Sequence, residues 1–383
     1  MSDLFLTPAA NSVTDRPIKV GMLGSGFRAR TMLRVLAALP QWFDVVGVAA
    51  RNADDRALLA DRGFPAYATV EHLVTHGRPD FVVCTVPGDQ SLPYLTALAE
   101  LGIPVLMETP PARGLAELLE LYQLVAAGAN IQVAEQYHLE PLVSAQLAVA
   151  GSDMLGVVTD AAVSLAHDYH GISVLRRALN AGFAEPLVTA RVDVRQVFPS
   201  PTRYRDPESL DLVPTNYTQA WFDYDDKSGV VDGPKLGVYS FDDAQYRSWV
   251  RSPSLVVRGP LGELRDDLVR LVAITDGEVA TPMAAHLERI SAGGAGSHEG
   301  LFLRGYQVFG EWAYYNPFLP ARLADEELAI ATMLARMGAH VLNGGPGPYP
   351  YAEATQDQYL ALIMKQAVAT GQSVRAVAQP WAN

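Results

Sequence analysis

The chain has 383 residues, of which 49% are hydrophobic and 19% are charged, and its formal net charge is −13. This length predicts two or three domains, and the composition predicts a folded protein with a sizeable core. The acidic balance argues against a nucleic-acid-binding protein, because such proteins need a basic face. No segment approaches the roughly 18 apolar residues of a membrane helix.

The N-terminus and the cysteine content bear on the cellular compartment. Residues 1–16 lack the basic segment and the long apolar run of a secretory signal, so we do not predict one. We predict that these residues are a loose lead-in to the first domain. Cys84 is the single cysteine and lies in the apolar run FVVCTV. A lone thiol cannot form an internal disulfide, so we expect a buried hydrophobic residue in a cytoplasmic protein.

Residues 18–30, IKVGMLGSGFRAR, predict a strand, a tight glycine turn and a helix. In the pattern G-x-G-x-x-A, Gly24 allows the sharp turn, Gly26 allows close approach of a pyrophosphate, and Ala29 permits close packing. The first N–H groups of the helix would point at the same phosphate. We therefore predict dinucleotide binding, whereas the alternative is a turn that only connects two elements. The residues assigned to this part of the cofactor are Gly24, Ser25, Gly26, Phe27 and Arg28.

Strands and helices alternate through the first third of the chain. Short apolar strands between helices are typical of a parallel sheet that is covered on both faces. The predicted strands after the first are residues 43–50, 81–86, 104–107 and 130–134, and the predicted helices are residues 54–63, 70–75, 94–101 and 115–127. We predict an α/β fold in which residues 17–136 form a Rossmann domain with a doubly wound parallel sheet.

The end of the second predicted strand reads AARN and indicates the form of the cofactor. NAD-binding domains usually place a carboxylate here for the ribose 2′-hydroxyl. Arg51 instead offers a guanidinium that could pair with a 2′-phosphate, which favours NADP over NAD. The alternative is that Arg51 stacks on adenine, which it could do with either cofactor. Asp54 and Asp55 come too late in the chain to be assigned to the 2′-hydroxyl.

The second half of the chain mixes strands with a few helices. The predicted strands are residues 157–165, 188–197, 219–224, 237–241 and 254–257, with strand-like alternation over 306–318. The predicted helices are residues 142–150, 172–179, 325–342 and 352–370. Residues 198–216 are rich in proline and charge, so we expect an insertion loop or lid.

Residues 167–170, HDYH, follow a predicted apolar strand and form the strongest catalytic candidate. Polar, titratable side chains are costly to bury without partners, and a histidine titrates near working pH. Asp168 could orient either His167 or His170. The alternatives are helix-capping or surface positions and a metal site, but no further ligand cluster is evident, so we predict no metal.

Several stretches match a known pattern: VGMLGSGFRAR, GVAARN, VCTVPGDQS, LGIPVLMETPPA, VAEQYHLEP and, near the C-terminus, YAEATQDQYLALIMKQAVATGQSV. They resemble the Gfo/Idh/MocA oxidoreductases, the glucose–fructose oxidoreductase and inositol dehydrogenase family. The resemblance implies that residues 137–383 form an α+β substrate domain with a large, open, mostly antiparallel sheet. Family members often oligomerise through that sheet, so the resemblance also implies a homo-oligomer, either a dimer or a tetramer.

The resemblance implies roles for individual residues. His170 corresponds to the family histidine that takes a proton from the reacting hydroxyl, and Tyr137 borders the substrate. The chain departs from the family at Thr109, where a lysine is usual, and at Ala166, where an aspartate is common. These departures imply an acid–base set that is either rebuilt or lost. The further cofactor positions implied are Thr85, Pro87, Ser91, Glu108, Thr109 and Gln136.

Three functions follow from these patterns. The first is an NAD(P)-dependent dehydrogenase or reductase that acts on a carbohydrate or polyol hydroxyl, with His170 as base and Tyr137 or Asp168 assisting. The second is a glycosidase with a tightly bound cofactor that uses transient oxidation, elimination, hydration and re-reduction. The third is a cofactor-sensing regulator without activity, which the absence of the lysine suggests and the residues 167–170 argue against.

Overall fold

The structure is a computed structural model that describes residues 14–86, 88–225, 227–229, 232–275, 279–294, 296–297 and 300–382. Its residues fall into two units, each built from separate stretches of the chain. Unit 1 comprises Met1–Pro141, Arg289–Gly305 and Tyr315–Thr355, and unit 2 comprises Leu142–Glu288, Tyr306–Tyr314 and Gln356–Asn383.

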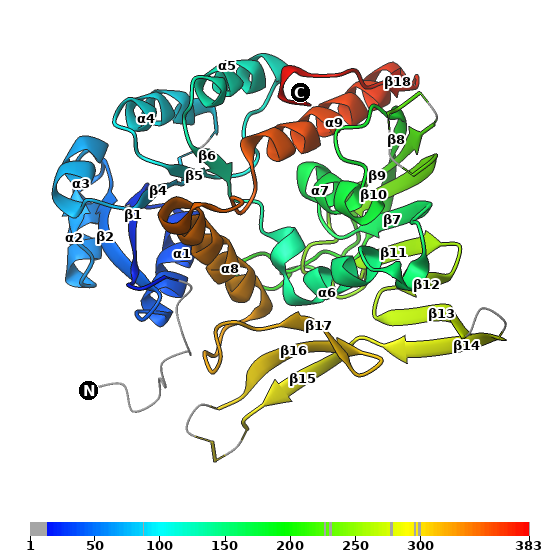
Figure 1. The fold of residues 1–383 in the computed structure, drawn as a ribbon. Helices are drawn as coiled ribbons and strands as arrows, with labels where there is room; N and C mark the ends of the chain where they lie inside the picture. Colours follow the sequence, from blue (N-terminus) through cyan, green and yellow to red (C-terminus); the bar gives the residue numbers. More distant parts are fainter. Residues whose placement is uncertain are drawn as a thin grey trace. The chain divides into compact units, whose positions relative to one another are not determined.

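Unit 1 is built on a parallel sheet of six short, buried strands in the order β3-β2-β1-β4-β5-β6 (Figure 1). The strand order reverses between β1 and β4, which is the position where open α/β sheets bind ligands. The strands are β1 Ile18–Leu23, β2 Phe43–Ala49, β3 Ala66–Tyr67, β4 Phe81–Cys84, β5 Val105–Met107 and β6 Ile131–Val133.

Helices lie on both faces of this sheet, with α4 and α5 on one face and α1 on the other (Figure 1). A side chain at Gly338 would meet Ile18 at 2.3 Å, so this glycine lets α8 pack closely on β1. The helices of unit 1 are α1 Phe27–Ala38, α2 Ala53–Asp61, α3 Val70–Gly77, α4 Gly88–Glu100, α5 Leu115–Ala126 and α8 Asp325–Ala339.

Unit 2 contains a nine-stranded sheet in the order β14-β13-β12-β11-β7-β10-β9-β8-β18. β10 pairs with β7 in parallel, whereas β8, β9, β11, β12, β13 and β14 pair antiparallel. The strands are β7 Asp160–Ser164, β8 Leu187–Val197, β9 Val213–Tyr224, β10 Lys235–Asp242, β11 Ser254–Gly259, β12 Gly262–Arg265, β13 Leu268–Thr275, β14 Val279–His286 and β18 Val374–Arg375.

A smaller, three-stranded sheet has the strand order β15-β16-β17. Its strands are β15 Glu288–Ala292, β16 Phe302–Val308 and β17 Glu311–Tyr315.

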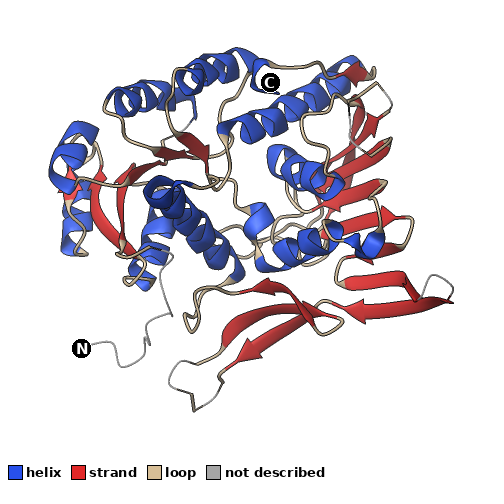
Figure 2. Cartoon of the chain, in the orientation of Figure 1, coloured by secondary structure: helices blue, strands red, loops and turns tan. Residues whose placement is uncertain are grey.

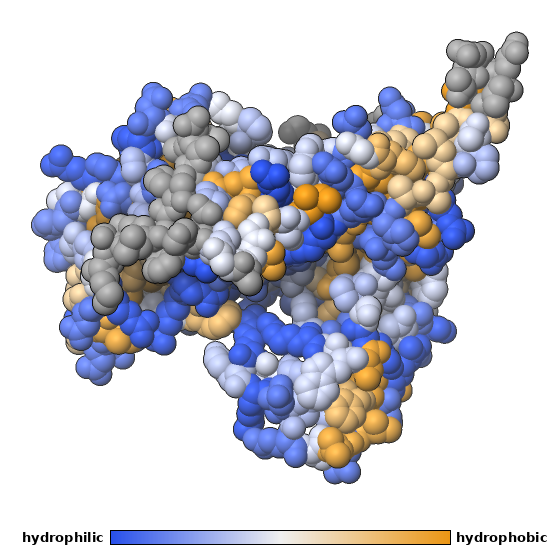
Figure 3. Space-filling view, turned by 90° about the horizontal axis from the view of Figure 1, so that it is seen from below, coloured by the Kyte–Doolittle hydropathy of each residue, from blue (hydrophilic) through white to orange (hydrophobic). Residues whose placement is uncertain are grey.

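Helix α7, Asp168–Leu179, packs on one face of the nine-stranded sheet (Figure 2). A side chain at Gly171 would lie 2.5 Å from the Tyr239 ring of β10, so this glycine brings the helix close to the strand. Hydrophobic residues are exposed elsewhere on the sheet, among them Leu236 and Val272. In the view of Figure 3, weakly hydrophobic residues gather over the β13–β14 hairpin. The remaining helices are α6 Pro141–Ala150 and α9 Tyr351–Thr370.

The predicted fold class is confirmed: a six-stranded parallel sheet precedes a larger, mostly antiparallel one. The main differences lie in element boundaries. Helix α7 begins at Asp168 rather than at residue 172, and β9 begins at Val213, inside the predicted insertion. The strands β13, β14 and β15 were not predicted, because their exposed faces leave a weak hydrophobic alternation. The two-domain division at residue 136 stays a prediction.

Two sequence features can be placed in the structure. Cys84 on β4 is fully buried, and this burial raises the pKa of its thiol to about 11, so it acts as a small core residue. Within the described residues, none of the helices combines the length and the hydropathy required to cross a membrane.

Candidate functional site

The glycine turn after β1 requires glycine for two reasons. Gly24 has φ +109°, a region that side chains rarely adopt, and an added Cβ would lie 2.4 Å from Thr85 Oγ1. The Thr85 hydroxyl donates to the Leu23 carbonyl at 2.9 Å, and the Gly24 N–H donates to Ala49 at 2.9 Å. The ends of β1, β2 and β4 therefore meet at this turn.

The N-terminus of α1 fits the pyrophosphate of a dinucleotide. Gly26 is its N-cap, and the first turn contains no acidic residue. Among the described residues, nothing lies within 4 Å of the position where a Gly26 Cβ would stand. A phosphate could therefore approach Gly26 closely, and the helix dipole favours negative charge at this end of α1.

Ser25, inside the glycine turn, contacts the start of α2. Its hydroxyl donates to Asp55 Oδ2 at 2.7 Å, and Arg30 donates to the Ser25 carbonyl at 3.0 Å and pairs with Asp55 at 3.4 Å. Sequence reasoning had set Asp55 aside as too far along the chain. The structure instead brings this carboxylate to the turn, where Ser25 and Arg30 engage it.

Two arginines lie near the end of β2, Arg51 in the turn that follows it and Arg56 on α2. Arg51 is exposed at the tip, as its predicted role requires. Arg56, which sequence reasoning missed, donates from Nη1 to the carbonyls of Ala50 at 2.8 Å and Arg51 at 2.7 Å. The side chain of Asn52 accepts from the Asp54 N–H at 2.7 Å and caps α2.

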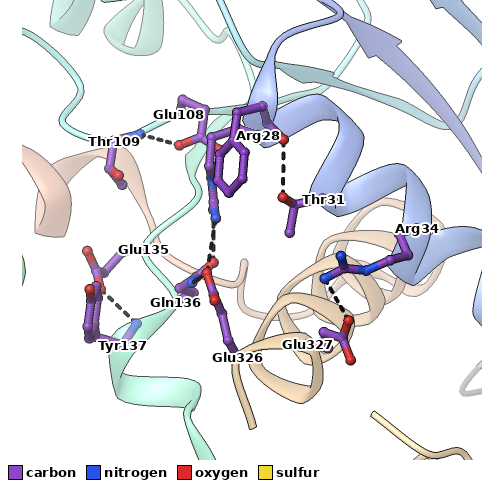
Figure 4. Close-up of polar contacts among 11 residues, drawn as sticks. Arg28, Thr31, Arg34, Glu108, Thr109, Glu135, Gln136, Tyr137, Glu326 and Glu327 are labelled. Carbon is purple, nitrogen blue, oxygen red and sulfur yellow. Dashed lines mark hydrogen bonds and ion pairs between the residues drawn. The ribbon is translucent and has the colours of Figure 1, made fainter. Parts of the chain in front are cut away.

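A polar cluster surrounds the guanidinium of Arg28, which extends from α1 toward the residues that follow β5 and β6 (Figure 4). Nε donates to Glu108 Oε1 at 3.0 Å, and Nη2 donates to Gln136 Oε1 at 2.9 Å. Gln136 donates in turn to Glu326 at 3.2 Å, and Glu326 lies 3.6 Å from Arg28. The Thr109 N–H donates to the other oxygen of Glu108 at 3.3 Å. The structure thus joins four predicted cofactor residues and adds Glu326, a helix-start residue with no sequence signal.

The remaining predicted residues of unit 1 make local contacts. The hydroxyl of Ser91 is buried and donates to the Gly88 carbonyl at 2.8 Å, within the first turn of α4. The Tyr137 N–H donates to Glu135 at 2.9 Å at the start of the 3₁₀ helix Tyr137–Leu139 (Figure 4). Pro87, predicted to contact the cofactor, lies outside the described residues.

The histidine group of unit 2 (His167, Asp168 and His170) lies at the N-terminus of α7. His167 Nδ1 is 2.6 Å from the Tyr246 hydroxyl, and the His167 and His170 rings are 5.3 Å apart. Asp168 pairs with Lys365 of α9 at 2.8 Å, and its N–H donates to the Tyr239 hydroxyl at 2.7 Å. Sequence reasoning missed Tyr239, Tyr246 and Lys365, because each lies far along the chain.

Backbone and electrostatics both distinguish this group. Asp168 has φ +39°, a strained value for a residue other than glycine, and strain of this kind clusters at functional sites. His167 is exposed as a whole, but the rings of Tyr246, Phe241 and His170 surround its imidazole. This partial desolvation, followed by the charge of His170, lowers the pKa of His167. The neutral form of the imidazole is therefore favoured.

The predicted site residues therefore form two groups, one in each unit. The structure brings Arg28, Glu108, Thr109 and Gln136 together in unit 1 and His167, Asp168 and His170 together in unit 2. Among the described residues, no group of three or more His, Cys, Asp or Glu could hold a metal ion.

Residues 18–137 match the model of a family described as an oxidoreductase family with an NAD-binding Rossmann fold, GFO_IDH_MocA. Over these residues the sequence matches the Gfo/Idh/MocA oxidoreductase family. The predicted resemblance is thereby confirmed for the cofactor domain, and the chain carries the NAD(P)-binding domain of an oxidoreductase. No curated protein matches the sequence.

Solved structures share the fold over nearly the whole chain. One is levoglucosan dehydrogenase in complex with NADH and levoglucosan, at 16% identity and a TM-score of 0.65, covering 94% of this chain and 100% of that chain. Another is an oxidoreductase from Agrobacterium radiobacter in complex with NAD+, L-tartaric acid and magnesium, at 14% identity and a TM-score of 0.65, covering 93% and 98%. A third is a putative NADPH-dependent oxidoreductase from Desulfitobacterium hafniense, at 14% identity and a TM-score of 0.63, covering 94% and 98%. At these identities the likeness establishes the fold.

Replacing Gly24 with alanine is expected to destabilise the protein by about 2–4 kcal/mol, because the change combines backbone strain with the contact to Thr85. Gly102→Ala is the matched control, since Gly102 also has positive φ, at +66°, but no atom of the described residues lies within 4 Å of its Cβ position. Urea unfolding of both variants measures the difference. Equal losses of stability would contradict the steric role of Thr85.

His167 is expected to titrate below its usual value of about 6.5. The imidazole of His167 therefore binds a proton less readily in the folded protein than in the unfolded chain. The contribution of His167 to the free energy of unfolding should fall as the pH drops below about 6.5. NMR titration of the imidazole, and unfolding of His167→Gln against wild type at several pH values, measure both effects. His170→Ala should raise the pKa of His167 partway, and a pKa at or above the usual value in the wild type would refute this assignment.

Proposed function

We propose that the protein transfers a hydride between the hydroxyl-bearing carbon of a carbohydrate or polyol and C4 of a nicotinamide cofactor. The observation that carries the proposal is the glycine turn at Gly24, with open space at the Cβ position of Gly26 among the described residues, in a segment that matches the Gfo/Idh/MocA family. The fold shared with levoglucosan dehydrogenase, whose structure contains a sugar, supports a sugar-like substrate.

The residues of unit 1 would hold the cofactor along the ends of the parallel strands. The backbone from Gly24 to Arg28 would receive the pyrophosphate, because the N–H groups of α1 point there. The residues after β5 and β6, Glu108 and Gln136, would hold the nicotinamide half, since the two nucleotide halves bind on opposite sides of the strand reversal. When bound, the cofactor supplies the hydride donor or acceptor.

The residues of unit 2 would manage the proton that accompanies the hydride. We assign His170 as the base that takes the proton from the reacting hydroxyl. His167 and Asp168 would orient the His170 imidazole, and Asp168 would help to balance its positive charge once it is protonated. The Tyr246 hydroxyl fixes the His167 ring, and Lys365 balances Asp168. Tyr137 would donate a hydrogen bond to a substrate hydroxyl.

NADP is the form of cofactor that we favour. The guanidinium of Arg56 contacts the backbone after β2, and the exposed Arg51 lies in the same turn, where the ribose 2′ position would bind. The nearby carboxylate of Asp55 already binds Ser25 and Arg30. It is therefore less able to accept a hydrogen bond from the 2′-hydroxyl of NAD.

Self-association is a further part of the proposal. The nine-stranded sheet exposes hydrophobic side chains such as Leu236, at 40%, and Val272, at 40%. A second copy that covers these side chains would remove apolar surface from water. A homodimer or homotetramer through this sheet is the state that we favour.

The second candidate function is the NAD-dependent glycosidase. Two histidines, an aspartate and a lysine within one group offer several proton-transfer partners, as a reaction with oxidation, elimination, hydration and re-reduction requires.

An aryl glycoside, a set of free sugars and NAD or NADP separate these functions. We expect the protein to bind NADP(H) more tightly than NAD(H) by calorimetry, and to accumulate NADPH with a free sugar or polyol. Release of the phenol without accumulation of NADPH would select the glycosidase instead. Absence of nucleotide binding would refute both.

Replacing His170 with alanine is expected to lower kcat by about 10²–10⁴-fold, the usual loss when a general base is removed. The affinity for the cofactor should stay near that of the wild type, because the cofactor residues lie in unit 1. His286→Ala, at an exposed histidine of β14, is the control and should leave kcat unchanged. Unaltered turnover in the His170 variant would exclude it as the base.

A further inference from the structure

Arg28 has its main chain and its side chain in two different parts of the candidate cofactor site. Its backbone belongs to the first turn of α1, beside Gly26. Its guanidinium contacts Glu108, Gln136 and Glu326 (Figure 4). We propose that Arg28 is a positioning residue that holds Glu108 and Gln136 in the orientation needed to bind the nicotinamide ribose. The inference rests on the proposed cofactor function and adds a role that the glycine pattern does not assign.

The charges in this cluster require a cation. The Glu108 side chain is only 14% exposed, and the Arg28 side chain is 24% exposed. A carboxylate so poorly hydrated needs a charged partner or several hydrogen bonds. Thr109, next along the chain, contributes its N–H to Glu108 but no positive charge. Arg28 is therefore the group that balances Glu108 in the described cluster.

The hydrogen bonds also set the orientation of Gln136. Its Oε1 accepts from Arg28, and its Nε2 donates to Glu326, so one orientation of the amide satisfies both partners. Because Glu108 follows β5 and Gln136 follows the neighbouring β6, one guanidinium aligns polar groups from two adjacent strand ends. Without Arg28, the two carboxylates Glu108 and Glu326 would repel each other across the Gln136 amide.

Arg34 provides a matched control on the same helix. It lies later on α1 and pairs with Glu327 of α8 at 2.7 Å, just as Arg28 pairs with the adjacent Glu326. Both arginines therefore link α1 to the first turn of α8. Replacing either one removes one positive charge, so the long-range repulsion of an anionic nucleotide changes equally in the two variants.

The experiment compares two nucleotides by calorimetry or fluorescence, using the full chain. ADP carries the adenosine and pyrophosphate but lacks the nicotinamide half, whereas NADPH and NADH carry both. Arg28→Met is expected to weaken binding of the reduced dinucleotide by about tenfold, as for the loss of charge-assisted hydrogen bonds. Its ADP affinity should change by less than about twofold, and Arg34→Met should change both affinities by less than about twofold.

A second variant tests the charge directly. Thr109 follows Glu108 directly in the chain, and its N–H lies 3.3 Å from Glu108 Oε2. A lysine at this position has a side chain long enough to bring an ammonium to the same carboxylate. The double variant Arg28→Met/Thr109→Lys keeps the net charge of the wild type. It is expected to recover most of the lost dinucleotide affinity, with thermal unfolding recorded for each variant to confirm that it is folded.

The outcomes are distinct. Unchanged dinucleotide binding in Arg28→Met would overturn the inference, and so would a parallel loss of ADP and dinucleotide affinity, which indicates damage to the α1 N-terminus. An equal loss of dinucleotide affinity in Arg34→Met would also overturn the inference, because it would show that Arg28 only links α1 to α8. If the wild type binds ADP and the reduced dinucleotide but catalyses no sugar reaction, the proposed activity fails while the role of Arg28 is still measured. If the wild type binds neither nucleotide, the cofactor site itself is refuted.

Discussion

The backbone conformation of Gly24 is the constraint on which unit 1 depends. Any side chain there would collide with Thr85 Oγ1, at 2.4 Å from an added Cβ, so only glycine lets the ends of β1 and β4 come together. These are the strands between which the order of the sheet reverses. The turn therefore places the N-terminus of α1 where parallel sheets bind ligands. Glu108 and Gln136 lie after β5 and β6, the next strands of the sheet beyond β4.

Charge around this turn is balanced within unit 1. The three arginines Arg28, Arg30 and Arg34 of α1 pair with carboxylates that lie just after β5, on α2 and on α8. In a chain with a net charge of −13, an anionic cofactor meets general repulsion. The backbone N–H groups at the start of α1 give it a local attractive site that does not depend on a free cation. The arginines can then orient acidic and amide side chains instead of binding the cofactor directly.

In unit 2, the position of the histidine group depends on how α7 is held. Asp168 adopts a strained left-handed conformation, which persists only where neighbours determine it. The Tyr239 hydroxyl and Lys365 provide those contacts at the start of the helix. Further along, the buried pair of Arg176 and Asp357 joins α7 to α9. Lys365 also belongs to α9, so one helix supports both ends of α7.

The sequence by itself determined the Rossmann fold and its glycine turn, because strand–helix alternation and the glycine spacing are local in the chain. The resemblance to the Gfo/Idh/MocA family was likewise carried by short local stretches. It also selected residues 167–170 as a candidate site, since four titratable residues in a row after an apolar strand are unusual at any place in a fold. The partners of these residues emerged only from the tertiary structure. Glu326, Tyr246 and Lys365 lie in helices or loops whose local patterns show only surface charge or core packing. Their roles depend on contacts between residues 79 to 298 positions apart in the chain, and such contacts leave no periodic signal. Helix packing, and not the spacing of residues, decided which cation would balance Glu108.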